Sequence, residues 1–169
     1  AAYDAPPSRD AAVLAAATGE AASAGCPATR SFPIPMAPPM AADALGVEAP
    51  SLDDLVQELT WPDPPPDVRW VELVGGPRSP LAVDGDGVDL TRRLRPDRVL
   101  LVADAGLGTI NAVLLSSAPF LELGIEPIVM LNRYDDLVDL HVRNLAWLTE
   151  RCPGPVVTHA TAVADLLVA

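Results

Sequence analysis

The chain has 169 residues, and its 23 Asp and Glu side chains outnumber its 11 Lys and Arg, which gives a formal net charge of -12. All 11 basic residues are arginines, so the chain offers no lysine for a Walker A phosphate loop, a Schiff base or a general base. The acidic balance argues against a nucleic-acid partner, because such binding depends mainly on neutralising phosphates.

Half of the residues are apolar, and the length suits a single domain with a real core, so we expect residues 1–169 to form one α/β domain. The sequence shows neither a signal peptide nor an apolar run long enough to span a membrane, and we expect a cytoplasmic protein with no membrane partner. Cys26 and Cys152 have no metal-binding spacing and predict two thiols in a reducing compartment. We interpret His141 and His159 as structural or exposed.

Two helices and a proline-rich loop are predicted in the first part of the chain. A helix over 8–19 is capped by Ser8 and ended by Gly19. Four prolines within 32–40 predict a rigid, irregular loop, since proline removes the backbone donors of helices and strands. A second helix begins after Ser51 with a capping box and stops before Trp61; its apolar face holds Leu52, Leu55, Val56 and Leu59.

From residue 68 onward, short apolar strands alternate with helices. We predict strands at 68–74, 98–103, 127–131 and 156–158, and helices at 109–123, 136–151 and 163–167. Pro119 should kink or end the first of these helices, and the second should face the core through Leu137, Leu140, Leu145 and Leu148. This alternation predicts a mostly parallel sheet covered on both faces. Because such sheets normally begin with a strand, we expect a leading strand-loop-helix-strand unit to be absent from the given residues.

Two carboxylates are candidates for a ligand crevice. Glu72 lies near the carboxyl end of a predicted strand, and Gly75 and Gly76 follow it and would let the backbone approach a ligand. The alternative is a tight turn in which Glu72 faces water or pairs with an arginine. Asp10 could be a second carboxylate in the same crevice, or an acid that interacts with the dipole of its own helix.

Two further motifs follow predicted strands. The turn over 105–111 carries Gly106 and Gly108 and opens a helix, where backbone N–H groups can bind a phosphate or a carboxylate. Asn132 offers the donor and acceptor that an adenine edge needs, although a local Asx turn is the alternative.

Together these segments resemble the dethiobiotin synthetases, ATP-dependent enzymes of late biotin synthesis in the P-loop NTPase superfamily. The resemblance rests on the proline loop 32–38, on the segment 71–81 with its Glu-x-x-Gly-Gly, on Leu-Gly-Thr-Ile-Asn at 107–111, and on Asn132.

The resemblance implies a three-layer P-loop NTPase-like fold of which the chain forms the C-terminal three-quarters. It implies an enzyme that closes the ureido ring of dethiobiotin from 7,8-diaminopelargonic acid, CO2 and ATP through a phosphorylated carbamate. The implied partners are this diamino acid, ATP with Mg²⁺, and a second copy of the chain in a homodimer. The implied site residues are Glu72, Gly75, Gly76 and Asn132 for the nucleotide, Asp10 and Glu72 for the metal, and Ala37, Pro38, Gly108, Thr109, Ile110 and Asn111 for the substrate.

The chain also departs from the family pattern. It contains no P-loop and no catalytic lysine, Leu73 stands where the family has glycine after the glutamate, and Ala112 stands where the family has histidine. Two alternatives therefore stay open: a paralogue that binds a small molecule or acts as a repurposed cyclase without ATP chemistry, and an arrangement in which another polypeptide supplies the P-loop.

Overall fold

The structure, a computed structural model, describes residues 9–25, 30–73 and 75–167, and the chain divides into two compact units. The first unit comprises residues 1–62 and 80–85, and the second comprises residues 63–79 and 86–169. The expectation of a single domain over the whole chain stays a prediction.

The first unit is mainly helical. It contains α1 (Arg9–Thr18), α2 (Ala22–Gly25), α3 (Pro38–Leu45) and α4 (Leu52–Glu58), together with β1 (Pro80–Ala82). The strand β1 contacts both α3 and α4, and it pairs with β2 (Gly85–Asp86) in a two-stranded sheet. Apolar residues of these elements form the buried interior, namely Ala11, Ala41, Ala42, Leu52, Leu81 and Ala82.

The helix predictions for this unit are largely confirmed. α4 has the predicted capping box, in which the Ser51 side chain accepts from the Asp54 amide and the Asp54 carboxylate accepts from the Ser51 amide. α1 ends before Gly19, which has a φ of +76°, while Ser8 and Cys26 lie outside the described residues.

The proline-loop prediction is wrong at its C-terminal end, because Pro38 and Pro39 begin α3. Proline fits the first turn of a helix, where its missing N–H would have no helical partner.

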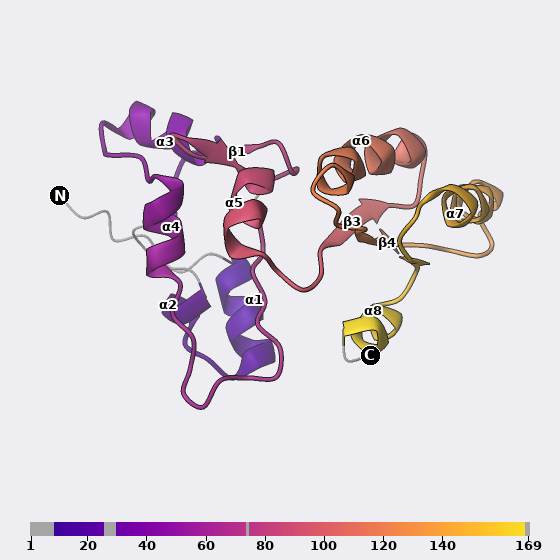
Figure 1. Cartoon of the computed structure of the whole chain (residues 1–169), viewed down its shortest axis with the longest axis horizontal. Helices are drawn as coiled ribbons and strands as arrows, with labels where there is room; N and C mark the ends of the chain where they lie inside the picture. The colour runs from indigo at the N-terminus through magenta and orange to yellow at the C-terminus, as the bar shows by residue number, and fades with distance from the viewer. Residues whose placement is uncertain (1–8, 26–29, 74, 168–169) are drawn as a thin grey trace. The chain divides into compact units, whose positions relative to one another are not determined.

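The second unit is built on a parallel sheet of three strands in the order β3-β4-β5. Its elements are α5 (Gly87–Leu94), β3 (Leu100–Asp104), α6 (Thr109–Leu121), β4 (Ile128–Asn132), α7 (Asp139–Arg151), β5 (Val156–Val157) and α8 (Ala160–Leu167). In Figure 1, α6 and α7 lie on one side of these strands and α8 lies on the other. The α/β prediction with a parallel sheet is therefore confirmed, while the full three-layer P-loop arrangement and its leading unit stay predictions.

The core of this unit lies between the sheet and the helices α6 and α7. It consists of Ala105, Val113, Val129, Leu131 and Leu148, with Leu145 and Trp147 packed against it. Pro119 lies inside α6, which continues to Leu121, so the proline does not end the helix, and the expected kink stays a prediction.

Two predictions for this unit are wrong. The described residues 68–73 form no strand, and Val68 and Trp70 are 45% and 49% exposed. A strand needs a neighbour for its backbone hydrogen bonds, and none of the described strands pairs with this segment. Leu137 and Leu140 do not face the core either: α7 begins only at Asp139, Leu137 is 90% exposed, and the core reaches only the later turns of the helix.

Candidate functional site

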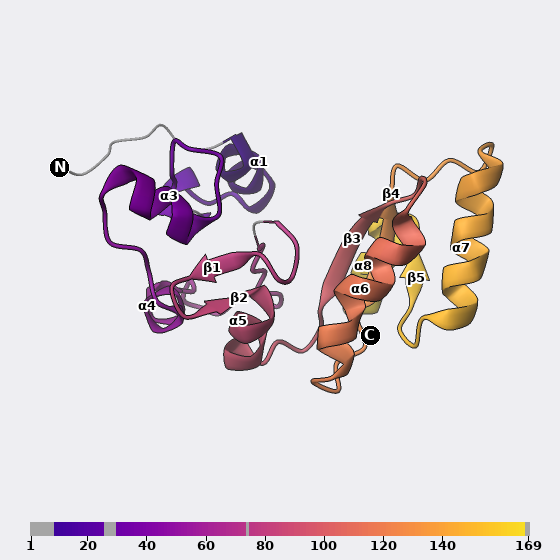
Figure 2. The same ribbon diagram turned by 90° about the horizontal axis from the view of Figure 1, so that it is seen from above.

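Two of the predicted site motifs meet at the carboxyl edge of the parallel sheet. The last residues of β3 and β4, Asp104 and Asn132, are register partners, and both are exposed. Because the two strands are parallel, the turn that leads into α6 and the loop after β4 leave from the same edge (Figure 2). The structure thus brings the predicted turn at 105–111 and Asn132 to one place.

The turn between β3 and α6 has a defined backbone geometry. The Asp104 carboxylate accepts a hydrogen bond of 2.7 Å from the Gly106 amide. Gly108 is the N-cap of α6 and has a φ of +90°, a conformation that glycine adopts without the steric cost of a Cβ. The backbone conformation of the turn is therefore sufficient to explain why residue 108 is glycine.

The first turn of α6 presents unpaired backbone donors. The first hydrogen bond of the helix runs from the Ala112 amide to the Gly108 carbonyl, at 3.1 Å. Within the described ranges, the N–H groups of Gly108, Ile110 and Asn111 find no acceptor. Such N–H groups, together with the helix dipole, favour an anion such as a carboxylate or a phosphate.

Thr109 adds a second unsatisfied group at the same helix end. Its side chain is 4% exposed, and its hydroxyl has no hydrogen-bond partner among the described residues. Buried hydroxyls in native proteins usually have a hydrogen-bond partner, so the Thr109 hydroxyl departs from the usual pattern.

Asn144 of α7 is a residue of this site that the sequence analysis missed. It is 6% exposed, and its Nδ2 donates to the carbonyl oxygens of Ala105 and Gly106 at 2.9 and 3.0 Å. In the sequence, Asn144 is recognisable as an amide side chain four residues before Leu148, and therefore on the helix face that packs inward.

Asn132 is partly engaged by its own neighbour. Its Oδ1 accepts from the Arg133 amide at 3.0 Å, and Arg133 has a φ of +57°, so a local turn is present. None of the described residues bonds to the Asn132 amide nitrogen, and the adenine-binding role stays a prediction. Beyond it, the His141 Nδ1 accepts from the Asp135 amide at 3.1 Å, and the interpretation of that histidine as structural or exposed stays a prediction.

The glycines after Glu72 form a tight turn. Gly75 has a φ of +78°, the Gly76 amide donates to the Ser79 hydroxyl at 3.0 Å, and the Ser79 amide donates to the Gly76 carbonyl at 2.9 Å. Glu72 itself is exposed. The tight-turn alternative thus describes the local backbone, and a nucleotide-binding role for these residues stays a prediction.

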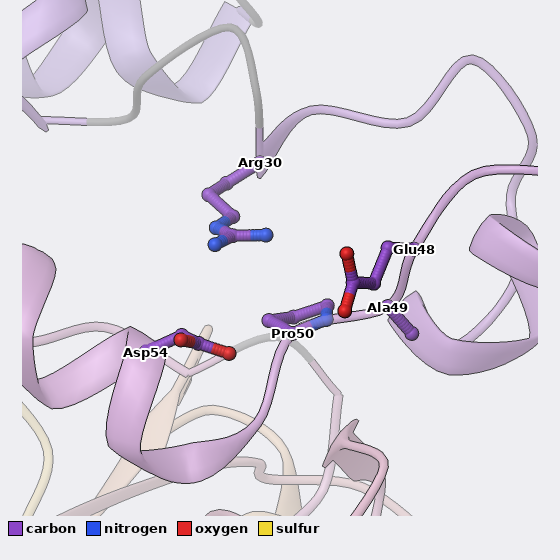
Figure 3. A pocket seen from close by; sticks show the side chains of 5 residues that line it. All are labelled: Arg30, Glu48, Ala49, Pro50 and Asp54. Carbon is purple, nitrogen blue, oxygen red and sulfur yellow. The ribbon is translucent and has the colours of Figure 1, made fainter.

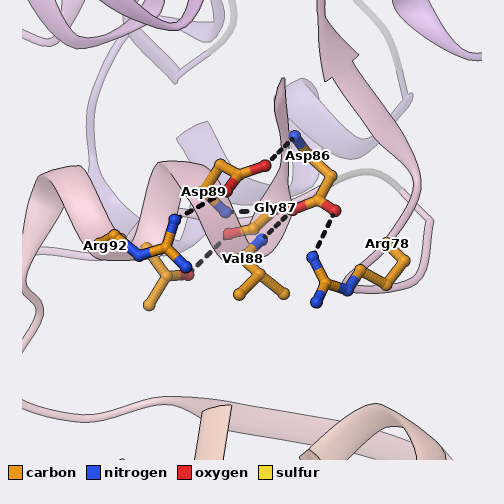
Figure 4. Close-up of polar contacts among 7 residues, drawn as sticks. Arg78, Asp86, Gly87, Val88, Asp89 and Arg92 are labelled. Carbon is orange, nitrogen blue, oxygen red and sulfur yellow. Dashed lines mark hydrogen bonds and ion pairs between the residues drawn. The ribbon is translucent and has the colours of Figure 1, made fainter. Parts of the chain in front are cut away.

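This turn is attached to the start of α5 (Figure 4). The Arg78 guanidinium donates to the Asp86 carboxylate at 3.0 Å, and the Val88 amide donates to the Pro77 carbonyl at 3.2 Å. Gly87 permits this approach, since a Cβ there would lie 2.9 Å from the Leu73 side chain and 3.0 Å from the Pro77 carbonyl oxygen.

The two carboxylates that the resemblance implies as metal ligands, Asp10 and Glu72, are both exposed and belong to different units. Carboxylates suit Mg²⁺. In the part of the chain that the structure describes, no three His, Cys, Asp or Glu side chains gather as a metal site. A metal role for these two residues therefore stays a prediction.

The first unit holds the other predicted substrate residues. Ala37 is the N-cap of α3 and Pro38 begins that helix, and both are half-buried.

The same unit contains an open pocket of about 200 Å³ that is lined by Arg30, Glu48, Ala49, Pro50 and Asp54 (Figure 3). Because Arg30 is already paired with Glu58, which lowers the pKa of that glutamate, the pocket offers no unpaired positive charge to an anion.

Comparison with known proteins supports the resemblance. The chain is similar to ATP-dependent dethiobiotin synthetases. It is 32% identical over 126 residues to the BioD enzyme of Xanthomonas oryzae pv. oryzae and 29% identical over 126 residues to that of Clostridium botulinum, which covers 74% and 73% of the chain. It is 41% identical over 86 residues to the BioD enzyme of Mycobacterium marinum, which covers 50% of the chain and 38% of that enzyme.

These similarities are partial. The chain spans 55% of the length of the Xanthomonas and Clostridium enzymes. No family model and no solved structure matches the chain. Within the described residues, no helix has the length and apolar character that crossing a membrane requires.

Proposed function

We propose that the protein is a dethiobiotin synthetase-like cyclo-ligase that acts on 7,8-diaminopelargonic acid, CO2 and ATP. The observation that carries this proposal is the similarity over 126 residues, at 32% identity, to an enzyme of that name. The unpaired amides at the start of α6 support it, because the substrate carries a carboxylate that such donors bind.

The reaction has three steps. One amine of the substrate adds to CO2 and loses a proton, which gives a carbamate. The γ-phosphoryl group of ATP is transferred to a carbamate oxygen, and ADP leaves. The second amine attacks the carbamate carbon, the C–O bond to the phosphate breaks, and phosphate and a proton are released as the cyclic urea closes.

We assign positioning tasks to residues of the second unit. The amides of Gly108, Ile110 and Asn111, with Thr109, bind the substrate carboxylate. Asn132 binds the adenine edge, and Gly75 and Gly76 let the backbone approach the nucleotide. Correct positioning and charge neutralisation supply most of the rate in phosphoryl transfer. Since the 169 residues contain no lysine, we assign no residue to neutralising the transferred phosphate.

The test is release of phosphate by the full-length protein from ATP and bicarbonate, with and without the diamino acid. The proposal requires release that depends on the diamino acid and a product of the mass of dethiobiotin. Asn132→Ala, at an exposed position, should raise the KM for ATP about tenfold and leave the KM for the diamino acid unchanged. Equal phosphate release with and without the diamino acid would refute the proposal.

A second candidate is a small-molecule-binding protein of the same fold that lacks ATP chemistry, and the absence of lysine favours it. Calorimetric titration separates the two candidates. The second requires that the diamino acid binds whereas ATP does not, and that no phosphate is released.

We also propose a cytoplasmic homodimer. Exposed leucines along and before α6 support self-association, since a soluble monomer rarely leaves an apolar stripe open; they are Leu107, Leu114, Leu115 and Leu121. Leu115 is 67% exposed, and Leu115→Glu should shift the sedimentation coefficient of the protein to that of a monomer. A wild-type protein that sediments as a monomer at high micromolar concentration would contradict the dimer.

A further inference from the structure

Asn144 links a helix of the second unit to the turn that begins α6. Its single amide group donates both of its protons to consecutive carbonyl oxygens, those of Ala105 and Gly106, at 2.9 and 3.0 Å. Asn144 is 6% exposed and Ala105 is fully buried, so water is excluded from the first of these bonds. A buried amide with this geometry fixes the orientation of two peptide units at once.

The orientation of a carbonyl determines the orientation of the next amide. In a planar trans peptide, the C=O of one residue and the N–H of the next point in opposite directions. When Asn144 holds the Gly106 carbonyl, the Leu107 N–H therefore points away from Asn144. The preceding amide, that of Gly106, is taken by the Asp104 carboxylate at 2.7 Å.

Asn144 thereby separates donors from acceptors in this turn. The carbonyl oxygens of Ala105 and Gly106 are directed to the side chain of α7. The amides of Leu107, Gly108, Ile110 and Asn111 have no acceptor within the ranges that the structure describes. An anion at this point would meet N–H groups and would not meet the negative ends of these two carbonyl dipoles.

A separate observation concerns a side chain at the same place. The Thr109 hydroxyl lies at the first residue of α6, is buried, and has no partner among the described residues. An unsatisfied buried hydroxyl costs free energy unless a ligand or water pairs with it.

We propose that Asn144 is a positioning residue for carboxylate binding, which holds the turn over 105–108 so that only its N–H groups face the substrate. This inference rests on the proposed function for the identity of the carboxylate. It adds a residue on α7 that does not touch the substrate and that the sequence motif of the turn does not include.

The experiment compares the binding of 7,8-diaminopelargonic acid with that of its methyl ester, by calorimetric titration of the full-length protein. The wild type should bind the acid at least about tenfold more tightly than the ester, since charge-assisted hydrogen bonds distinguish the two. Asn144→Leu keeps the branching of the side chain at Cγ and removes both donors, and it should lower the ratio of the two affinities at least about threefold.

Leu148→Val is the matched control. Leu148 is fully buried one turn further along α7 and makes no hydrogen bond to the turn, so this variant loosens the packing but leaves the donors of Asn144 in place. It should lower the melting temperature and keep the wild-type affinity ratio. If Asn144→Leu does not fold, Asn144→Ser, which keeps one donor, should give an intermediate ratio.

The outcomes separate this inference from the proposed function. An affinity ratio in Asn144→Leu, or failing that in Asn144→Ser, equal to that of the wild type overturns the inference, as does a wild type that does not prefer the acid. A lowered affinity ratio in Asn144→Leu, together with a wild type that releases no phosphate, refutes the proposed reaction and leaves the role of Asn144 supported.

Discussion

Replacement of Asp86 by alanine should destabilise the second unit through the start of α5 (Figure 4). Asp86 is the N-cap of this helix, and its Oδ1 accepts from the amides of Val88 and Asp89 at 2.8 and 3.0 Å. Its Oδ2 accepts from Arg78, which ties the Gly75–Ser79 turn to the helix.

The expected loss of stability depends on which backbone amides keep a hydrogen-bond acceptor in the variant. In Asp86→Ala the Val88 amide retains the Pro77 carbonyl at 3.2 Å, whereas the Asp89 amide loses its acceptor. Loss of such a cap costs about 1.5 kcal/mol of the free energy of unfolding. The ion pair between Arg78 and Asp86 adds little to this cost, because Arg78 is exposed and water screens the pair. Urea unfolding at pH 7 measures the change.

Asp86→Ser is the matched control. Serine keeps an acceptor for the first-turn amides and removes the charge, so it should lie within about 0.5 kcal/mol of the wild type. Equal destabilisation by serine and alanine would refute the capping argument, as would an alanine variant as stable as the wild type.

The same residue predicts a pH dependence. Burial raises the pKa of Asp86, but hydrogen bonds from the Asp89 amide, the Arg78 guanidinium and the Val88 amide outweigh it and hold the pKa below its ordinary value. A carboxylate whose pKa is lowered by folding stabilises the folded state above its unfolded pKa of about 3.9 and loses this effect as the pH falls through the folded pKa. The difference between the wild type and Asp86→Ala should therefore shrink between pH 5 and pH 3.

Three further predictions concern the sheet and its helices. Gly154→Ala would place a methyl group against the carbonyl oxygen of Pro127 and should cost about 2 kcal/mol in urea unfolding. Gly124→Ala has open space around it but a φ of +75°, so only the left-handed backbone is strained and the cost should be about 1 kcal/mol. Leu148→Ala should cost about 3 kcal/mol, since Leu148 is fully buried in the core. Burial raises the pKa of Cys152, so iodoacetamide at pH 7 should modify this thiol more slowly in the folded than in the unfolded protein.

The sequence predicted elements well where the local signals were strong. The capping box at Ser51 and the strands of 98–103 and 127–131 depend on nearest neighbours and on burial within one short segment, and the structure confirms them within one or two residues. The helix α5 was missed, although Asp86 and Asp89 form a second capping box, because its apolar pattern spans only two turns.

Predictions that depend on distant partners were less successful. The segment 68–73 has strand-forming residues, but a strand also needs a neighbouring strand, and sequence alone does not show whether one is present. At the candidate site, the glycine turn over 105–111 was recognisable from its motif. Asn144 was not, because its contact with Ala105 joins residues that are 39 positions apart.

The most direct test of the account is to follow ¹³C-labelled bicarbonate in the presence of the full-length protein, ATP and 7,8-diaminopelargonic acid. We expect a new carbon resonance of a cyclic urea, with one phosphate released for each urea formed. Label that remains entirely in bicarbonate and the open carbamate, with ATP unconsumed, would contradict it.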